Sequence, residues 1–171
     1  MRQAVSAGYE GYLIKQEIGY SLAASVTIAA RSGHFVLTPG GYMMALQQRI
    51  ALPEGSLVLD GRKSTTLLTP REAEIARLAI LFNQPYRDLS DELLIRADQV
   101  AKHVSSIYSK LGLDEFLAGE IRPESMFEDP LIVARFSRIL ERVAASPARG
   151  KTADMATLAF HLLTVPEIRR I

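Results

Sequence analysis

The stretch LTPREAEIARLAILFNQPYRDLSDELLIRADQVAKHVSSIYSKLGL, residues 68–113, predicts three helices joined by short turns. Thr69 can cap the first helix, and Pro70 suits its first position. Glu72, three residues after Thr69, completes a capping box. The residues at 83–85, Asn-Gln-Pro, end this helix. Its apolar face is expected to hold Ile75, Leu78, Ala79 and Phe82.

A second, shorter helix is expected from about Tyr86 to Leu94, with Leu89 and Leu93 buried. The third helix, over 97–111, carries its apolar residues at helical spacing, which predicts a single packed stripe. These residues are Val100, Val104, Ile107, Tyr108 and Leu111. Gly112 ends the third helix. Three short helices with tight connections predict a compact helical unit.

The other side of the third helix is polar. Its residues are Gln99, Lys102, His103, Ser106, Ser109 and Lys110. Small hydrogen-bonding side chains let a helix approach a DNA groove closely, and lysine neutralises phosphates. A solvated helix face is the simpler alternative. The tight turn between the second and third helices favours the first interpretation, because it is typical of a helix-turn-helix.

The same stretch resembles the DNA-binding domain of LuxR/NarL-type transcription regulators. The matching pieces are LTPRE in the first helix, DLSDELLI in the second and QVAKHVSSIYSKLGL in the third. The resemblance implies a cytoplasmic regulator that binds duplex DNA as a homodimer, with RNA polymerase as a further partner. It implies that the DNA-binding residues are Thr69, Gln99, Val100, Lys102, His103, Ser106 and Lys110. Of these, Thr69 and Lys110 are expected near phosphates.

The chain departs from the family pattern in the third helix. Arg96 stands where the family places a capping Ser or Thr, Gln99 replaces Thr, and Ala101 replaces Lys. Six basic and six acidic residues lie between Leu68 and Leu113, so the formal charge of the unit is zero. Few phosphate contacts predict weak binding by a monomer, for which dimerisation onto two half-sites would compensate.

Residues 1–50 are similar to the end of a receiver domain, as found in response regulators of two-component systems. The strand-like segment GYLIK would be the last strand, with Tyr12 as the switch aromatic and Lys15 as the active-site lysine. A helix follows, with Ser21 as its cap and Gly33 as its stop. The phosphoacceptor part is missing, so we expect no phosphorylation-driven switching. Residues 51–67 are interpreted as a linker with one hairpin or extended piece.

Residues 114–171 predict a C-terminal extension with two longer helices. In DPLIVARFSRILERVAAS one face is apolar and three arginines lie outside it, and SPARGK then breaks the chain. TADMATLAFHLLTV is apolar almost all round, which indicates burial either within this chain or against a second copy. His161 lies in this segment and is interpreted as a core residue.

The overall composition fits this assignment of a mainly α, LuxR-type helix-turn-helix protein. The chain of 171 residues has no cysteine, a formal charge of +1 and no apolar run long enough to span a membrane. The three histidines have no partners at metal-ligand spacing, so no metal, cofactor or catalytic residue is expected. Two alternatives stay open: a degenerate protein–protein interaction module that does not bind DNA, and a factor associated with RNA polymerase.

Overall fold

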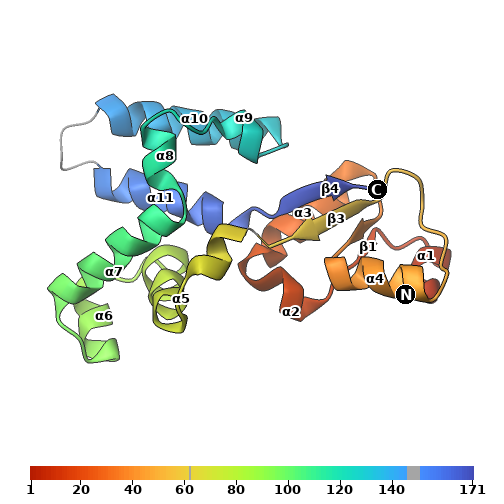
Figure 1. The fold of residues 1–171 in the computed structure, drawn as a ribbon, viewed down its shortest axis with the longest axis horizontal. Helices are drawn as coiled ribbons and strands as arrows, with labels where there is room; N and C mark the ends of the chain where they lie inside the picture. The colour runs from red at the N-terminus through yellow and green to blue at the C-terminus, as the bar shows by residue number, and fades with distance from the viewer. Residues whose placement is uncertain (62, 146–150) are drawn as a thin grey trace. The chain divides into compact units, whose positions relative to one another are not determined.

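The computed structural model describes residues 1–61, 63–145 and 151–171, and the chain divides into two compact units. Unit 1 comprises Met1–Arg62 together with Thr164–Ile171, and unit 2 comprises Lys63–Leu163. The expectation of a mainly α protein is confirmed, and the chain also contains one small four-stranded sheet (Figure 1). Within the described ranges, no helix has the length and apolar character needed to cross a membrane.

The sheet belongs to unit 1 and has the strand order β1-β2-β3-β4. The three parallel strands are β1 (Gly11–Tyr12), β2 (Val36–Leu37) and β3 (Leu57–Asp60). The C-terminal strand β4 (Glu167–Arg170) pairs antiparallel with β3. The apolar residues of β2 and β3 are buried on both sides of the sheet, as in parallel sheets covered by helices on both faces.

Helices cover the two faces of this sheet. On one face α3 (Leu22–Ser32) packs Ile28 and Ala29 against a cluster of Val36, Leu57 and Leu59. On the other face α4 (Pro39–Gln47) brings Gly41 against Tyr12. The remaining helical turns of unit 1 are α1 (Arg2–Ser6), α2 (Lys15–Ile18) and η1 (Gly19–Ser21). As expected, α3 begins after Ser21 and ends at Gly33, whose φ of 67° is left-handed.

The interpretation of residues 1–50 as a separate receiver remnant, followed by a linker at 51–67, needs correction. After the helix at 22–32 the chain does not leave the sheet, because it returns as β2 and again as β3. Strand β3 lies between β2 and β4, so residues 57–60 are an inner strand rather than a linker. Strand β4 was not expected, because its Glu-Ile-Arg-Arg sequence has only one apolar residue. Pairing with β3, rather than strand propensity, therefore places it.

Unit 2 is helical in its described residues. Its elements are η2 (Lys63–Leu67), α5 (Pro70–Ala76), η3 (Arg77–Leu81), α6 (Tyr86–Leu93), α7 (Ala97–Lys110), α8 (Leu113–Leu117), α9 (Pro123–Met126), α10 (Pro130–Ala145) and α11 (Lys151–Thr164). The last residue of α11 already belongs to unit 1. The three helices expected over 68–113 correspond to α5 with η3, α6 and α7. Their core contains Ile75, Leu89, Val100, Val104 and Ile107, all at most 2% exposed.

The apolar face expected for the first helix is wrong at its last member. The helix changes after Ala76 into the π-helical segment η3, in which the backbone N–H of Phe82 donates to the carbonyl of Arg77. A π turn contains one residue more than an α turn, so it shifts the helical register. Phe82 is consequently 68% exposed instead of packed.

The C-terminal helices form an aromatic core of their own. The buried ring of Phe136 in α10 lies 4.9 Å from that of Phe116 and 5.0 Å from that of Phe127. In α11, Leu158, Ala159 and Leu162 are fully buried. Of the two alternatives for this apolar helix, the structure therefore favours packing within its own chain. Most of the break expected at SPARGK, at residues 146–150, lies outside the described residues.

Candidate nucleic-acid interface

The turn between α6 and α7 consists of residues 94–96. Leu94 ends α6 in the left-handed conformation, with φ 52° and ψ 40°. Ser90 closes the turn, since its hydroxyl donates to the carbonyl of Ile95 at 2.6 Å and its own carbonyl accepts the Ile95 N–H at 3.1 Å. Arg96 is extended and α7 begins at Ala97. This tight turn fixes the direction in which α7 leaves α6.

The start of α7 is capped by Gln99. Arg96 cannot act as a capping acceptor, because its guanidinium only donates hydrogen bonds. Instead, the side-chain oxygen of Gln99 accepts the backbone N–H of Arg96 at 3.3 Å. The Arg96 guanidinium donates to Asp98 at 2.9 Å, and Asp98 lies in the first turn, where a negative charge is favourable. Gln99, expected to contact a base, therefore takes part in the cap.

Glu72 of α5 joins three segments of unit 2. Its carboxylate accepts the backbone N–H of Thr69 at 2.8 Å, the Ser106 hydroxyl at 2.9 Å and the Lys110 ammonium at 2.6 Å. The hydroxyl of Thr69 in turn accepts the Glu72 N–H, which completes the expected capping box. Glu72 is only 4% exposed. This buried carboxylate therefore fixes α7 against the beginning of α5.

The partners of Glu72 outweigh the effect of its burial on its acidity. Burial alone raises the pKa of this carboxyl, but the hydrogen bonds from Lys110, the Thr69 backbone, Ser106 and the Thr69 hydroxyl lower it. The net result is a pKa of about 2, compared with an ordinary 4.5. Glu72 is therefore ionised at neutral pH, and its charge is balanced by Lys110.

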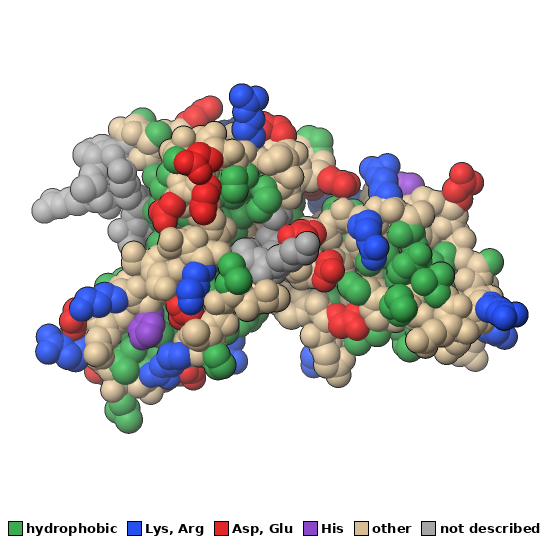
Figure 2. All heavy atoms as spheres, in the orientation of Figure 1, with side chains coloured by type: hydrophobic (Ala, Val, Ile, Leu, Met, Phe, Trp, Pro, Cys, Tyr) green, Lys and Arg blue, Asp and Glu red, His purple; other side chains and the backbone are tan. Residues whose placement is uncertain are grey.

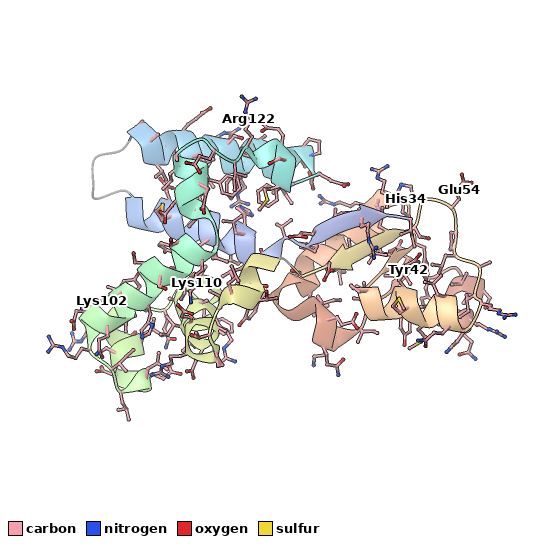
Figure 3. The ribbon with its side chains drawn as sticks, in the orientation of Figure 1. His34, Tyr42, Glu54, Lys102, Lys110 and Arg122 are labelled. Carbon is pink, nitrogen blue, oxygen red and sulfur yellow. The ribbon has the colours of Figure 1, made fainter. Side chains whose placement is uncertain are left out.

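Three of the residues expected to bind DNA have structural positions instead. Val100 is fully buried, so its side chain belongs to the packed stripe and not to the DNA-binding face. Ser106 and Lys110 are half-buried and bound to Glu72. Figure 3 shows Lys110 next to α5, whereas Lys102 lies farther along α7. Thr69 caps α5, although its side chain stays exposed.

The exposed side of α7 lies directly opposite its buried stripe. Its residues are Asp98, Ala101, Lys102, Ser105 and Ser109. We call this set the α7 outer face. Of the residues expected to bind DNA only Lys102 belongs to it, and His103 is half-buried. Ala101 and Ser105 were missed. The helical period could have found Ser105, because positions 98, 102, 105 and 109 are opposite a stripe at 100, 104, 107 and 111.

Exposed basic residues lie on α6, on the turn and on α7. Arg87 of α6 and Arg96 of the turn are exposed, as is Lys102 itself. Figure 2 shows Lys and Arg side chains gathered at the end of unit 2 that carries α6 and α7. A hydrogen bond between the hydroxyls of Tyr86 and Tyr108 joins α6 to α7, and burial raises the pKa of Tyr108 above its usual range. Both tyrosines are therefore neutral donors and acceptors at neutral pH.

The two residues assigned from the receiver resemblance lie in unit 1. Tyr12 is the second residue of β1, and its carbonyl accepts the backbone N–H of Thr38. Lys15 begins α2 and is exposed. Within the described ranges, no three or more Asp, Glu or His residues are placed to hold a metal ion. The chain matches no family model, no curated protein and no solved structure.

Proposed function

We propose that the chain is a transcription regulator that binds duplex DNA through α7, with α6 and α7 acting as a LuxR/NarL-type helix-turn-helix. The observation that carries the proposal is the division of α7 into three sides. One side is packed in the core, a second is bound to α5 through Glu72, and the third is the exposed α7 outer face. Small side chains and one lysine on that face suit insertion into a major groove.

Four members of the α7 outer face have a chemical part in this proposal, and the fifth, Asp98, stays paired with Arg96. Lys102 contacts a phosphate or a guanine edge, and Ser105 and Ser109 donate to base or phosphate oxygens. The Ala101 methyl packs against a thymine methyl. Arg87 and Arg96 add phosphate contacts at the border. These few charges predict weak binding by one chain, so the active form in this proposal is a homodimer on two half-sites. The family resemblance adds a cytoplasmic location and a contact with RNA polymerase.

A second candidate function is a protein–protein interaction module. Two apolar side chains near the two ends of α6 favour it, since Phe82 is 68% and Leu94 is 91% exposed. Large exposed apolar side chains can belong to protein contact sites. In this alternative the packed helices serve as a scaffold, and the α7 outer face is a solvated surface.

The direct test is selection from a pool of randomised duplexes at low salt. We expect enrichment of a two-fold symmetric motif, and we expect Lys102→Glu to weaken binding to it at least tenfold by placing a negative charge near phosphates. The matched control is Arg138→Glu, an exposed position in α10 away from α7. Enrichment of no motif by the folded protein would favour the interaction module instead.

A further inference from the structure

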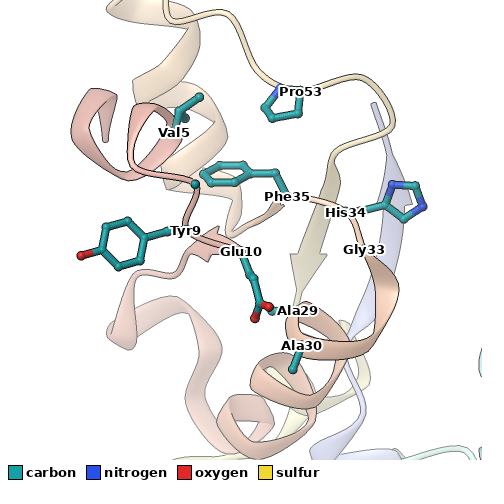
Figure 4. A pocket seen from close by; sticks show the side chains of 10 residues that line it. Val5, Tyr9, Glu10, Ala29, Ala30, Gly33, His34, Phe35 and Pro53 are labelled. Atoms are coloured by element: carbon teal, nitrogen blue, oxygen red, sulfur yellow. The ribbon is translucent and has the colours of Figure 1, made fainter.

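Unit 1 contains a pocket at the amino ends of its parallel strands. It has a volume of about 280 Å³, and its lining includes residues that precede each of the three parallel strands (Figure 4). Glu10 lies directly before β1, Phe35 directly before β2, and Pro53 lies before β3. The volume is slightly below the range of pockets for drug-sized ligands, so it suits a molecule of few atoms.

The opposite end of the sheet is filled by the chain itself. Small ligands of α/β proteins usually bind at the carboxyl ends of the strands. Here the Glu17 carboxylate occupies that place, accepting the backbone N–H of Gly40 at the start of α4 at 2.8 Å. The hydroxyl of Thr38 is also taken, because it accepts the N–H of Ile14. The pocket at the amino ends is therefore the better candidate for a ligand.

The lining of the pocket has one fixed charge, and that charge is negative. None of its described lining residues is Lys or Arg, and the carboxylate of Glu10 has no hydrogen bond or ion pair with another described residue. In Figure 4 the Glu10 carboxylate points toward Ala29, whereas the His34 ring points away to the other side. A ligand in this pocket therefore meets an unpaired carboxylate.

The walls around Glu10 are apolar and aromatic. Val5, Ala29, Ala30 and Pro53 supply aliphatic surface, and Phe35 supplies a buried aromatic ring, whereas the Tyr9 ring points away from the Glu10 carboxylate and is 66% exposed (Figure 4). Aromatic faces attract cations through their negative π-electron density, and quaternary ammonium groups are the ligands that such rings most often recognise. An apolar wall with a single carboxylate suits an organic cation better than a metal ion, which needs several oxygen ligands.

We propose that this pocket binds a small organic cation of the alkylammonium class, with Glu10 as the counter-ion and Phe35 as the aromatic contact. The site is independent of DNA binding, since all of its residues belong to unit 1. It would give the chain a ligand-binding function in addition to the function proposed for unit 2.

The test measures binding of choline to the full-length chain by calorimetry at low salt, with 3,3-dimethylbutan-1-ol as its neutral isostere. We expect saturable binding of choline and at least fivefold weaker binding of the alcohol, because only the cation interacts with Glu10 and the Phe35 ring. Glu10→Gln should weaken choline binding about fivefold. Glu54→Gln, an exposed position outside the pocket lining, should leave choline binding unchanged.

A second variant tests the location of the site without changing its charge. Ala30 is exposed and lines the pocket, so the larger side chain of Ala30→Leu should fill the space and abolish binding. If circular dichroism shows that this variant is unfolded, the choline affinity of Glu10→Gln alone decides whether the proposal holds. Absence of saturable choline binding, equal affinity for the alcohol, or full affinity in the folded Glu10→Gln variant would each overturn the proposal.

Discussion

At the scale of single residues, Glu72 connects the beginning of α5 to the last turns of α7. A buried carboxylate with three donors is stabilising only while it is ionised. The unfolded chain binds a proton near pH 4.5, whereas the folded chain binds it only near pH 2. The resulting stability is therefore fully present above about pH 5 and is lost as the pH falls toward 2.

The first prediction concerns this pH dependence. The shift of the Glu72 pKa corresponds to about 3 kcal/mol of unfolding free energy, of which about 2 kcal/mol should be lost between pH 6 and pH 3. Glu72→Gln should remove this part of the pH dependence. Denaturant unfolding at both pH values measures it. In the control Glu74→Gln, which changes an exposed ion pair with Arg71, the pH dependence should remain.

His161 of α11 is a buried base in aromatic surroundings. Its ring lies 6.4 Å from that of Phe136 and 5.9 Å from that of Phe160, and its Nε2 has no hydrogen-bond partner in the described structure. Burial first, and then the charge of Arg135, lower its pKa below the ordinary 6.5. Just below pH 6.5, His161 therefore binds a proton more readily in the unfolded chain than in the folded chain. Stability should fall as the pH drops below 6.5.

The second prediction follows from this sign. Wild-type protein should lose stability between pH 7.5 and pH 5.5, and His161→Phe should lose clearly less because its ring has no proton to bind. Denaturation midpoints at the two pH values provide the measurement. His103→Gln, at a half-buried position in α7, should behave like the wild type. Identical pH dependence of the wild type and His161→Phe would show that His161 is protonated without penalty in the folded chain.

Leu94 combines a left-handed backbone with a side chain that is 91% exposed. A non-glycine residue in this conformation costs about 1–2 kcal/mol, and Asn tolerates it better than other residues. The third prediction is that Leu94→Asn raises the unfolding free energy by about 0.5–1 kcal/mol, since almost no apolar burial is lost. Leu131→Asn, an exposed change in the first turn of α10, should produce no such gain. A destabilised Leu94→Asn variant would indicate that Leu94 packs more than its exposure suggests.

At the scale of elements, the helices over 68–113 could be predicted because their signals are local. The capping box at Thr69, the break at 83–85 and the stripe of α7 all depend on residues within a few positions of each other. The π-helical segment η3 could not be predicted, because its register shift has no sequence signal of its own. Phe82 was consequently placed on the wrong face.

The exposed side of α7 was predicted only in part for a related reason. Six residues were assigned to one polar side of α7, but two of them, Ser106 and Lys110, are bound to Glu72 of α5. Glu72, which binds these two side chains, is 34 positions from Ser106 and 38 from Lys110 in the sequence. Polarity alone does not distinguish a solvated side chain from one bound to a buried carboxylate. The same holds for β3 and β4, whose pairing joins residues more than a hundred positions apart.

Strand β4 gives the fourth prediction. It covers the edge of β3 through a four-residue ladder, and Ile168 packs onto the cluster beneath α3. A chain that ends at Thr164 should therefore lose amide-exchange protection in β3 while α7 keeps its own. Hydrogen exchange of the two segments measures this difference. Unchanged protection of β3 would contradict the account, as would equal loss of protection in α7.

At the scale of the whole molecule, the chain connects its two units twice. It leaves unit 1 after residue 62 and returns to it after residue 163, where α11 ends and β4 soon follows. Unit 1 therefore contains both ends of the chain (Figure 1). The amino-terminal 62 residues hold three of the four strands and the last eight hold the fourth, so unit 1 needs both segments to complete its sheet.

The central claim is that α7 binds DNA with its outer face while its Glu72-bound side is structural. The most direct measurement is the salt dependence of binding to the selected duplex, for the wild type, Lys102→Ala and Arg138→Ala. The account predicts that Lys102→Ala lowers the slope of log K against log salt by about 1, the loss of one phosphate contact, while Arg138→Ala leaves the slope unchanged. An unchanged slope and affinity in folded Lys102→Ala would contradict the account.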